Sequence, residues 1–573
     1  MRTATRTGAQ ETLTAAILAM AERKSVPARL RGRSGWVHTT QAALLEDALA
    51  VVHGLRCQGI RPGEHVALLG LPPADAVPCF LGAVLAGALP VQLHPPLHLG
   101  RFDVFRLHVA RVLARVDAHA LVTTDRLLPL LAGLPIARLL LPADVRGSEA
   151  GTPEAASPSA PAFMQLTSGS TSGTPRAIVL SHGAVTANVR SLATRAGLRP
   201  DDVGYTWLPL YHDMGLVGCV LMGIAVGMEG IVSSPEQFVR HPLGWLLDMS
   251  RFQATSTAAP CFALHLCVEA ARRTGIPTDL DLGALRVLIC GGEPVEAAVV
   301  DRFCKTFAPY GLRRRVIRPA YGLAEACLGV TMTAEGGGRT MSVDRRALAL
   351  ENRFVPAADA SARRIHSVGT PLDGITVALV DDEGRRIDDE DRVGAVLVQS
   401  PGVMDAYWDD PAATSAALAD GWLHTGDLGA FHGRELYITG RAKGVVIVNG
   451  RNYNAEDVES LVRELPGVRA HAVAAMECAP DEGRGLLVIA ETDCRDPVAL
   501  RELARRIRER IASDAGIMPS EIVLIDARQM PRTTSGKIQR SRCRELYRGG
   551  ELRVLHQERE HASWTPSNAA ALP

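Results

Sequence analysis

Residues 167–177 read TSGSTSGTPRA, a run in which hydroxyl side chains alternate with glycines. The run lies between two apolar segments, residues 163–166 and 178–180, which we expect to be strands. Small residues let backbone N–H groups approach an anion, and Ser and Thr hydroxyls donate to phosphate oxygens, so such a loop can bind a polyphosphate. It lacks the GxxxxGK[ST] pattern of a Walker loop. Taken alone, it fits a solvated Ser/Gly linker equally well.

The composition of the whole chain is that of a globular protein with several cores. Its 573 residues are 47% hydrophobic and 22% charged, which excludes global disorder and predicts two or three domains. With 62 basic and 62 acidic residues there is no net charge to attract nucleic acid or an anionic membrane. Eleven cysteines without a CxxC pair argue against a disulfide framework or a zinc site and indicate a reducing cytoplasm.

Two longer apolar stretches do not predict membrane insertion. Residues 76–93 contain prolines and glycines, and residues 214–228 are too few to span a bilayer. We therefore expect no transmembrane segment.

Lysine is rare in this chain. Of its 62 basic residues only Lys24, Lys305, Lys443 and Lys537 are lysines. An ammonium is a compact point charge, whereas a guanidinium is planar and forked. A lysine within a motif of this arginine-rich chain therefore indicates a position where a guanidinium would not fit the chemistry.

The hydrophobic pattern predicts a large layered α/β part followed by a small α+β part. Apolar strand-like runs at 65–69 and 89–93 alternate with helical patterns, and similar alternation continues to about residue 440. Residues 142–161 are rich in Pro, Ser and Gly and indicate a surface linker or a long loop. From about residue 444 the order becomes helix, two strands, helix and strand.

Four further segments carry motif-like sequences in a fixed order. They are LPLYHDMGLVG at 208–218, YGLAE at 321–325, WLHTGDL at 422–428 with YITGRAKGVVIVNG at 437–450, and PRTTSGK at 531–537. Together with residues 167–177 they resemble the motifs of the adenylate-forming superfamily, which includes acyl-CoA synthetases, nonribosomal-peptide adenylation domains and luciferases. The resemblance covers roughly residues 30–550.

Within that superfamily the motif sequences are similar to those of the fatty acyl-AMP ligases. HDMGL at 212–216, CGGEPV at 290–295, Ala324 in place of the more usual Thr, and GRNYNAEDVE at 450–459 favour this group. The long polar stretch 335–366 resembles the insertion by which these ligases differ from acyl-CoA synthetases, although a plain surface loop is the alternative.

The resemblance implies an ATP site along the motifs. The residues that would hold the phosphates are Thr167, Ser168, Ser170, Thr171, Thr174 and Arg176, with Gly169, Gly291 and Gly322 completing the ATP site. Tyr321 would stack on adenine, Asp427 would accept the ribose hydroxyls, and Arg441 would reinforce that contact. Arg176 stands for a usual Lys, Ala177 for a usual Gly, and the loop is one residue longer, counting Ser172.

The catalytic assignments follow the same resemblance. Glu325 would bind Mg²⁺, and His212 would lie between the acyl chain and the adenylate, with a core histidine as the rival reading. Lys537 would reach the carboxylate and α-phosphate oxygens, where a point charge stabilises the developing transition state. Lys443 matches the hinge of the small domain, although a charged linker residue is the alternative.

We therefore predict an adenylate-forming fold, α/β in class. A large layered α/β N-terminal domain (1–442, with 335–366 as the insertion) is followed by a small mobile α+β C-terminal domain (443–550) and a polar tail (551–573). The expected reaction joins a fatty acid and ATP, with Mg²⁺, into an acyl-adenylate. Roughly thirty residues follow Cys543, too few for a carrier domain, so an acyl carrier protein would act in trans. An acyl-CoA synthetase and a non-catalytic adenylate-binding protein are the alternatives.

Overall fold

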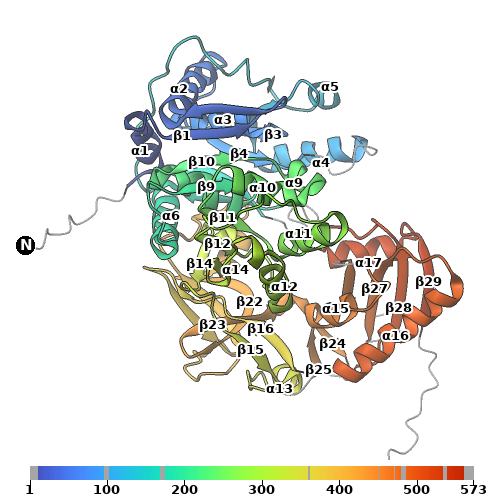
Figure 1. Cartoon of the computed structure of the whole chain (residues 1–573). Coiled ribbons are helices and arrows are strands. Elements are labelled where there is room, and N and C mark those ends of the chain that lie inside the picture. Colours follow the sequence, from blue (N-terminus) through green and yellow to red (C-terminus); the bar gives the residue numbers. More distant parts are fainter. Residues whose placement is uncertain are drawn as a thin grey trace, which may run out of the picture.

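The structure is a computed structural model. It describes residues 11–95, 102–167, 175–358, 362–448, 451–469, 472–478, 485–515, 517–532 and 538–559. Figure 1 shows a large body coloured blue to yellow and a smaller orange-to-red part that lies at its side. The predicted α/β class, with a large layered domain and a small α+β domain, is confirmed.

A nine-stranded sheet forms one layer of the large domain. Its order is β17-β14-β13-β12-β11-β9-β10-β1-β2, and the neighbours from β13 to β1 run parallel. The strands are β1 (Pro27–Arg31), β2 (Trp36–Thr40), β9 (Val203–Thr206), β10 (Glu229–Val232), β11 (Ser256–Ala259), β12 (Val287–Cys290), β13 (Ile317–Gly322), β14 (Gly329–Met332) and β17 (Thr370–Pro371).

A seven-stranded sheet forms the second layer, in the order β20-β8-β7-β4-β3-β5-β6. Its strands are β3 (His65–Leu69), β4 (Leu89–Leu93), β5 (Ala118–Thr123), β6 (Arg138–Leu140), β7 (Pro161–Leu166), β8 (Ala177–Ser181) and β20 (Ala406–Tyr407). Every residue of β3 and β4 is buried, as expected for parallel strands covered on both faces. Residues 142–160, between β6 and β7, form a long loop that bonds to α2 (Gln41–Cys57) through Gly147 and Gly151.

Helices cover and join these sheets. One hydrophobic cluster contains residues of both sheets and of the helices around them, such as Leu68, Phe80, Phe163 and Val232. The helical segments of this domain are α1 (Leu13–Leu18), η1 (Ala19–Glu22), α3 (Pro73–Leu85), α4 (Phe102–Arg115), α5 (Leu128–Leu131), α6 (His182–Ala196), α7 (Asp213–Gly215), η2 (Leu216–Leu221), α8 (Met222–Val226), α9 (Pro235–Arg240), α10 (Pro242–Arg251), α11 (Cys261–Thr274), α12 (Ala297–Phe307), η3 (Ala308–Tyr310), η4 (Arg314–Val316), η5 (Ala324–Ala326) and α14 (Pro411–Ala417).

A third, five-stranded sheet completes the large domain. It consists of β18 (Thr376–Val380), β19 (Gly394–Gln399), β21 (Leu418–Ala419), β22 (Trp422–His432) and β23 (Glu435–Arg441). Its last strand ends at Arg441, directly before η6 (Ala442–Gly444), where the chain leaves for the small domain.

The stretch 335–366 folds onto this third sheet. It contains the antiparallel pair β15 (Thr340–Val343) and β16 (Arg363–His366), with α13 (Arg345–Leu350) between them. Phe354 is fully buried in a cluster with Tyr437 of β23 and Ala430 of β22. Burial of a Phe side chain contributes about 1.5–3 kcal/mol, which favours a docked element over a loose surface loop. On its other side α13 lies against β25 (Arg451–Asn454).

The small domain is built on a four-stranded sheet, β26-β27-β28-β29. Its elements are β24 (Val445–Val448), β25, β26 (Val473–Glu477), β27 (Leu486–Thr492), β28 (Glu521–Asp526), β29 (Val554–Arg559), α15 (Ala455–Arg463), α16 (Pro497–Ala515) and α17 (Arg540–Arg548). One apolar face of α16 is buried through Leu500, Leu503, Ile507 and Ile511. The expectation of a polar tail from residue 551 is wrong for residues 554–559, because β29 pairs with β28 and completes the sheet.

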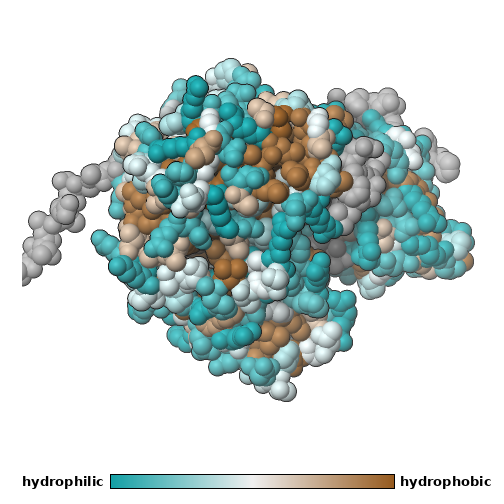
Figure 2. Space-filling view, turned by 90° about the horizontal axis from the view of Figure 1, so that it is seen from above, coloured by the Kyte–Doolittle hydropathy of each residue, from teal (hydrophilic) through white to brown (hydrophobic). Residues whose placement is uncertain are grey.

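Figure 2 shows mostly hydrophilic side chains on one face, interrupted by smaller hydrophobic patches. Among the described residues, no helix is both long and apolar enough to cross a membrane.

Candidate active site

A cleft lies where strands of the two large sheets end. It encloses about 220 Å³. Its lining includes residues from the ends of β7, β12, β13 and β23, consistent with the rule that α/β sheets bind ligands beyond the carboxyl ends of their strands. Eight residues predicted for the site line this cleft together: Thr167, Arg176, His212, Gly291, Tyr321, Gly322, Glu325 and Arg441.

Two of the predicted glycines are needed for close backbone approach. A Cβ atom at Gly291 would lie 2.8 Å from the backbone oxygen of Ala320. A Cβ atom at Gly322 would overlap the backbone oxygen of Leu328. Neither position can carry a side chain without moving the strand beside it, so both glycines shape the cleft wall.

Asp427 joins Tyr321 and Arg441 into one polar unit. The hydroxyl of Tyr321 donates to Oδ2 of Asp427 at 2.7 Å, and Nε of Arg441 donates to Oδ1 at 2.7 Å. Asp427 is 3% exposed, while the Arg441 side chain is about half exposed to the cleft. Burial, and then the Asp427 charge, raise the pKa of Tyr321, so this hydroxyl stays a donor. The unit presents hydrogen-bonding groups at one end of the cleft.

Glu325 belongs to a second polar unit that includes two residues absent from the sequence-based assignment. The hydroxyl of Tyr407 donates to Oε1 of Glu325 at 2.8 Å. The guanidinium of Arg176 lies 5.3 Å from the centroid of the Tyr407 ring and 3.5 Å from Oδ2 of Asp410. Burial, followed by the Glu325 charge, raises the pKa of Tyr407 and keeps it protonated. The predicted metal ligand and the predicted phosphate-binding Arg are therefore held by the same aromatic ring.

Tyr407 and Asp410 had no motif to mark them. They lie within PGVMDAYWDD at 401–410, whose residues carry no recognisable spacing for phosphate or metal chemistry. The one available signal was a Tyr among acidic residues just before the next motif. Their contacts with Glu325 and Arg176 arise only when β20 pairs with β8.

His212 lies in the cleft and begins a helical turn. Its Nδ1 lies 2.6 Å from Oδ1 of Asp213, which requires it to donate, and the backbone N–H of Met214 donates to the same oxygen at 2.7 Å. The Asp213 side chain is buried and the His212 side chain is about one quarter exposed. The ring is thus fixed by its own segment, and its role toward an acyl group stays a prediction.

Several predicted residues lie outside the described part of the chain. They are Ser168, Gly169, Ser170, Thr171, Thr174 and Lys537. The stems of both loops are described: the N–H of Thr167 donates to the backbone oxygen of Arg176 at 2.8 Å, and Arg532 bridges to Ile538. For Lys443 the structure describes only the backbone, within η6.

The oxygen donors of the cleft fit a magnesium ion bound together with phosphates. Mg²⁺ prefers oxygen ligands and usually binds through one or two carboxylates plus substrate phosphates and water. Glu325 supplies such a carboxylate, and among the described residues only its Oε1 is engaged, by Tyr407. Glu325 would hold the ion, which when bound neutralises phosphate charge.

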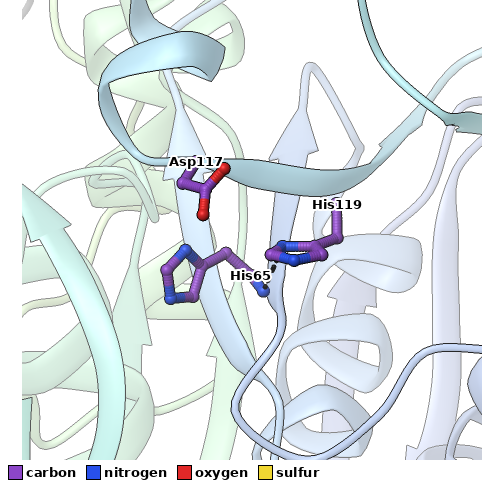
Figure 3. Close-up of side chains that lie close together, drawn as sticks. All are labelled: His65, Asp117 and His119. Carbon is purple, nitrogen blue, oxygen red and sulfur yellow. Dashed lines mark hydrogen bonds between the residues drawn. The ribbon is translucent and has the colours of Figure 1, made fainter.

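A second group of titratable side chains lies away from the cleft. His65, Asp117 and His119 have nitrogen and oxygen atoms within 4.8 Å of one another (Figure 3). Nδ1 of His65 lies 2.6 Å from the backbone oxygen of Val116, which requires it to donate, and Nδ1 of His119 accepts the backbone N–H of His65 at 3.3 Å. Both rings are thereby engaged in joining the starts of β3 and β5, so we assign the group a structural role.

Comparisons with known proteins place the chain among adenylate-forming enzymes. The family described as AMP-binding enzyme matches residues 19–408. A long-chain-fatty-acid–AMP ligase, FadD26 of Mycobacterium marinum, is 32% identical over 90% of this chain and 92% of its own length. A medium-chain-fatty-acid–[acyl-carrier-protein] ligase, JamA of Moorena producens, is 35% identical over 68% of each chain.

Solved structures agree with this placement. A structure from a study of fatty acyl-adenylate ligases of E. coli and L. pneumophila has a TM-score of 0.87 and 28% identity, over 94% of this chain and 98% of that one. A fatty acyl-adenylate ligase from L. pneumophila in complex with acyl adenylate and pyrophosphate has a TM-score of 0.73 and 28% identity, over 96% and 98%. The predicted resemblance in fold and family is confirmed.

Proposed function

We propose that this chain, which belongs to the AMP-binding enzyme family, converts a fatty acid and ATP to an acyl-adenylate and pyrophosphate. The observation that carries the proposal is the cleft that contains Thr167, Arg176, Tyr321, Glu325 and the Asp427-bound Arg441 together. A carboxylate that attacks the α-phosphate meets like-charge repulsion, so the protein must chiefly position the groups and neutralise charge.

Each polar unit of the cleft has a distinct part in this proposal. The ring of Tyr321 would pack on adenine, while Asp427 and Arg441 would bind the ribose. Because Asp427 already accepts two hydrogen bonds from protein donors, ribose hydroxyls would use its remaining lone pairs. Arg176 and the adjoining hydroxyl loop would hold the β- and γ-phosphates, and Glu325 would hold Mg²⁺. Lys537 would bring a point charge to the reacting carboxylate and α-phosphate.

The position of Arg532 supports the assignment of Lys537. Arg532 is half-buried and lies near enough to Glu293 for their charges to interact. Glu293 follows Gly291 and Gly292, which both line the cleft. Arg532 and Ile538 form a β-bridge, so the described residues on the two sides of Lys537 lie next to each other.

The acceptor in this proposal is the thiol of an acyl carrier protein in another chain. A relative named as an acyl-carrier-protein ligase supports it. The stretch 335–366 supports it too, because it is anchored on the large domain through Phe354 while α13 lies against β25 of the small domain. Such a bridge would restrain rotation about Lys443, and a docked carrier could offset that restraint with its own interface energy. The eleven free cysteines favour a reducing cytoplasm as the site of action.

The activity is tested by incubating the full chain with ATP, Mg²⁺ and fatty acids of graded length. Release of pyrophosphate that depends on the fatty acid, with acyl-AMP in the mass spectrum, is the expected result. Absence of pyrophosphate release with every fatty acid would favour the non-catalytic adenylate-binding alternative. Acyl-CoA formed as fast as acyl-AMP, when coenzyme A is added, would favour the acyl-CoA synthetase.

The restraint is tested by replacing Arg345–Leu350 of α13 with a Gly/Ser linker of equal length. This change leaves β15, β16 and the buried Phe354 in place, whereas removal of the whole stretch would open the cluster around Tyr437. The variant should still form acyl-AMP at the parent rate and should gain transfer to coenzyme A. If acyl-AMP formation is intact and coenzyme A is still refused, the restraint is not in α13.

A further inference from the structure

An apolar cavity lies directly behind the cleft. It encloses about 60 Å³ and shares four lining residues with the cleft: Gly218, Met222, Ala258 and Ile289. Its other lining residues come from the nine-stranded sheet, from η2, α8, α2 and α3, and from the segments after α6 and α8 that contain Leu198 and Met228. The two spaces therefore meet under η2.

The floor of this cavity is made by strand register. One row across the sheet consists of Ala28, Gly230, Gly204, Ser256 and Val287, each paired with the next. The neighbouring row on the same face consists of Leu30, Val232, Thr206, Ala258 and Ile289. All ten residues line the cavity. Since four of the five residues in the first row are small and three in the second are large and branched, the floor is a groove one row wide that crosses the strands.

Met228 blocks this groove partway along. A Cβ atom at Gly204 would overlap the Cε of Met228, so the end of that side chain lies on Gly204. At Gly230, one strand further, a Cβ atom would have no atom within 4 Å. Met228 is 4% exposed, and its backbone oxygen is held by Nε2 of Gln41 at 2.8 Å. The groove is therefore filled over β9 and empty over β10.

We propose that the acyl chain of the substrate extends from the cleft into this groove across β11, and that Met228 sets its maximal length. The inference rests on the proposed function and adds to it a specificity-determining residue. The substrate class that fits is an unbranched hydrocarbon chain, because the groove is one row wide and the charged residue of its lining, Glu229, is paired with Arg29. Neighbouring strands lie about 4.8 Å apart, so each strand that the acyl chain crosses corresponds to roughly four carbons of an extended chain with bonds of about 1.5 Å.

The first test is Met228→Ala, assayed by kcat/KM for acyl-AMP formation along a series of straight-chain fatty acids. The longest chain accepted should increase by up to about eight carbons, as the space over β9 opens and joins the empty space over β10. Each newly buried CH₂ contributes about fourfold, so a substrate four carbons longer than the parent limit should gain on the order of a hundredfold. Short fatty acids should react as with the parent enzyme. Met249→Ala is the matched control, since Met249 is equally buried but belongs to the core on the other side of the sheet.

The second test places a side chain in the empty part of the groove. Gly230→Val alone should leave the length limit unchanged, because the parent chain ends before β10. Combined with Met228→Ala, it should cut the gain to about four carbons, because only the space over β9 stays open. Thermal melting checks that each variant is folded.

The outcomes separate this inference from the proposed function. If no fatty acid yields acyl-AMP with the parent enzyme, the proposed function fails. If acyl-AMP forms but the length limit of Met228→Ala equals that of the parent and of Met249→Ala, the assignment of Met228 is wrong. A double variant with the same limit as Met228→Ala would show that the chain does not follow the groove over β10.

Discussion

The polar cleft and the apolar groove share Gly218, Met222, Ala258 and Ile289, yet they are built in different ways. The cleft presents polar side chains that are fixed by hydrogen bonds, such as Asp427 between Tyr321 and Arg441. The shape of the groove results from the absence of side chains at Gly204 and Gly230 and from the side chain of Met228, which is flexible.

This difference separates reaction from selectivity. A charged group fixed by partners acts on phosphate and carboxylate oxygens that every substrate has in common. A groove of small residues acts only on the part of the substrate that varies, and the unbranched Met side chain adapts to it. Changes in the cleft should therefore alter rates by one factor for all chain lengths, while changes in the groove should alter the length profile.

The largest effect is expected from Lys537→Ala. Loss of the point charge at the reacting oxygens should lower the rate of acyl-AMP formation by ~10²–10³. The apparent affinity for ATP should stay nearly constant, because the charge acts mainly on the transition state. Lys305→Ala, an exposed lysine on α12, is the control. A Lys537→Ala rate within a few-fold of the parent would remove Lys537 from the site, and a changed length profile would contradict the separation drawn above.

Asp427→Asn should act on nucleotide binding instead. Hydrogen bonds to charged groups contribute about 1.5–3 kcal/mol, so we expect KM for ATP to increase about 10- to 100-fold. The increase should be equal for short and long fatty acids. Asp381→Asn is the control, because Asp381 lies in a turn paired with Arg385 and away from the cleft. An unchanged KM for ATP would defeat the ribose assignment.

The cleft and the groove also differ in how far they can be predicted from the sequence. The cleft residues lie in short contiguous motifs, so Tyr321 and Glu325, or Asp427, are marked by their immediate neighbours. Tyr407 reaches Glu325 across 82 positions, through the pairing of β20 with β8. The groove is harder to predict from the sequence, because its floor takes two residues from each of five strands and depends on the register of those strands.

For the fold, local patterns were sufficient where burial is uniform and insufficient where pairing is distant. The fully buried β3 and β4 and the amphipathic α16 were predicted from their own residues. Residues 554–559 read VLHQER, a polar run that indicates a tail, yet they pair with β28 along one edge of the small sheet. An edge strand with a solvated face lacks the apolar signal of a buried strand.

A smaller effect is expected from Tyr407→Phe. The change removes one hydrogen bond to Glu325 and keeps the ring beneath Arg176. A net loss of about 0.5–1.5 kcal/mol should increase the Mg²⁺ concentration for half-maximal activity about 2- to 10-fold. The maximal rate at saturating Mg²⁺ and the length profile should change little. Tyr547→Phe, which removes a Tyr to Glu521 bond in the small domain, is the control. An equal Mg²⁺ requirement in all three proteins would exclude Tyr407 as a positioning residue.

The smallest effect is expected at the contact between the domains. Nη1 of Arg463 on α15 lies 3.4 Å from Oε1 of Glu296, and the same guanidinium is held at 2.9 Å by the buried Glu459. Partly exposed ion pairs contribute about 0–1 kcal/mol and are screened by salt, so Glu296→Gln should lower acyl-AMP formation at most about fivefold, and less at high ionic strength. Glu464→Gln is the control, because its pair with Arg510 lies within the small domain. If the Glu296 pair holds the small domain in the orientation that brings the Lys537 loop to the cleft, only Glu296→Gln should show a salt-dependent loss. The loss should be equal for every chain length, since the groove lies wholly in the large domain; a loss confined to long chains would mean that the small domain also contacts the acyl group.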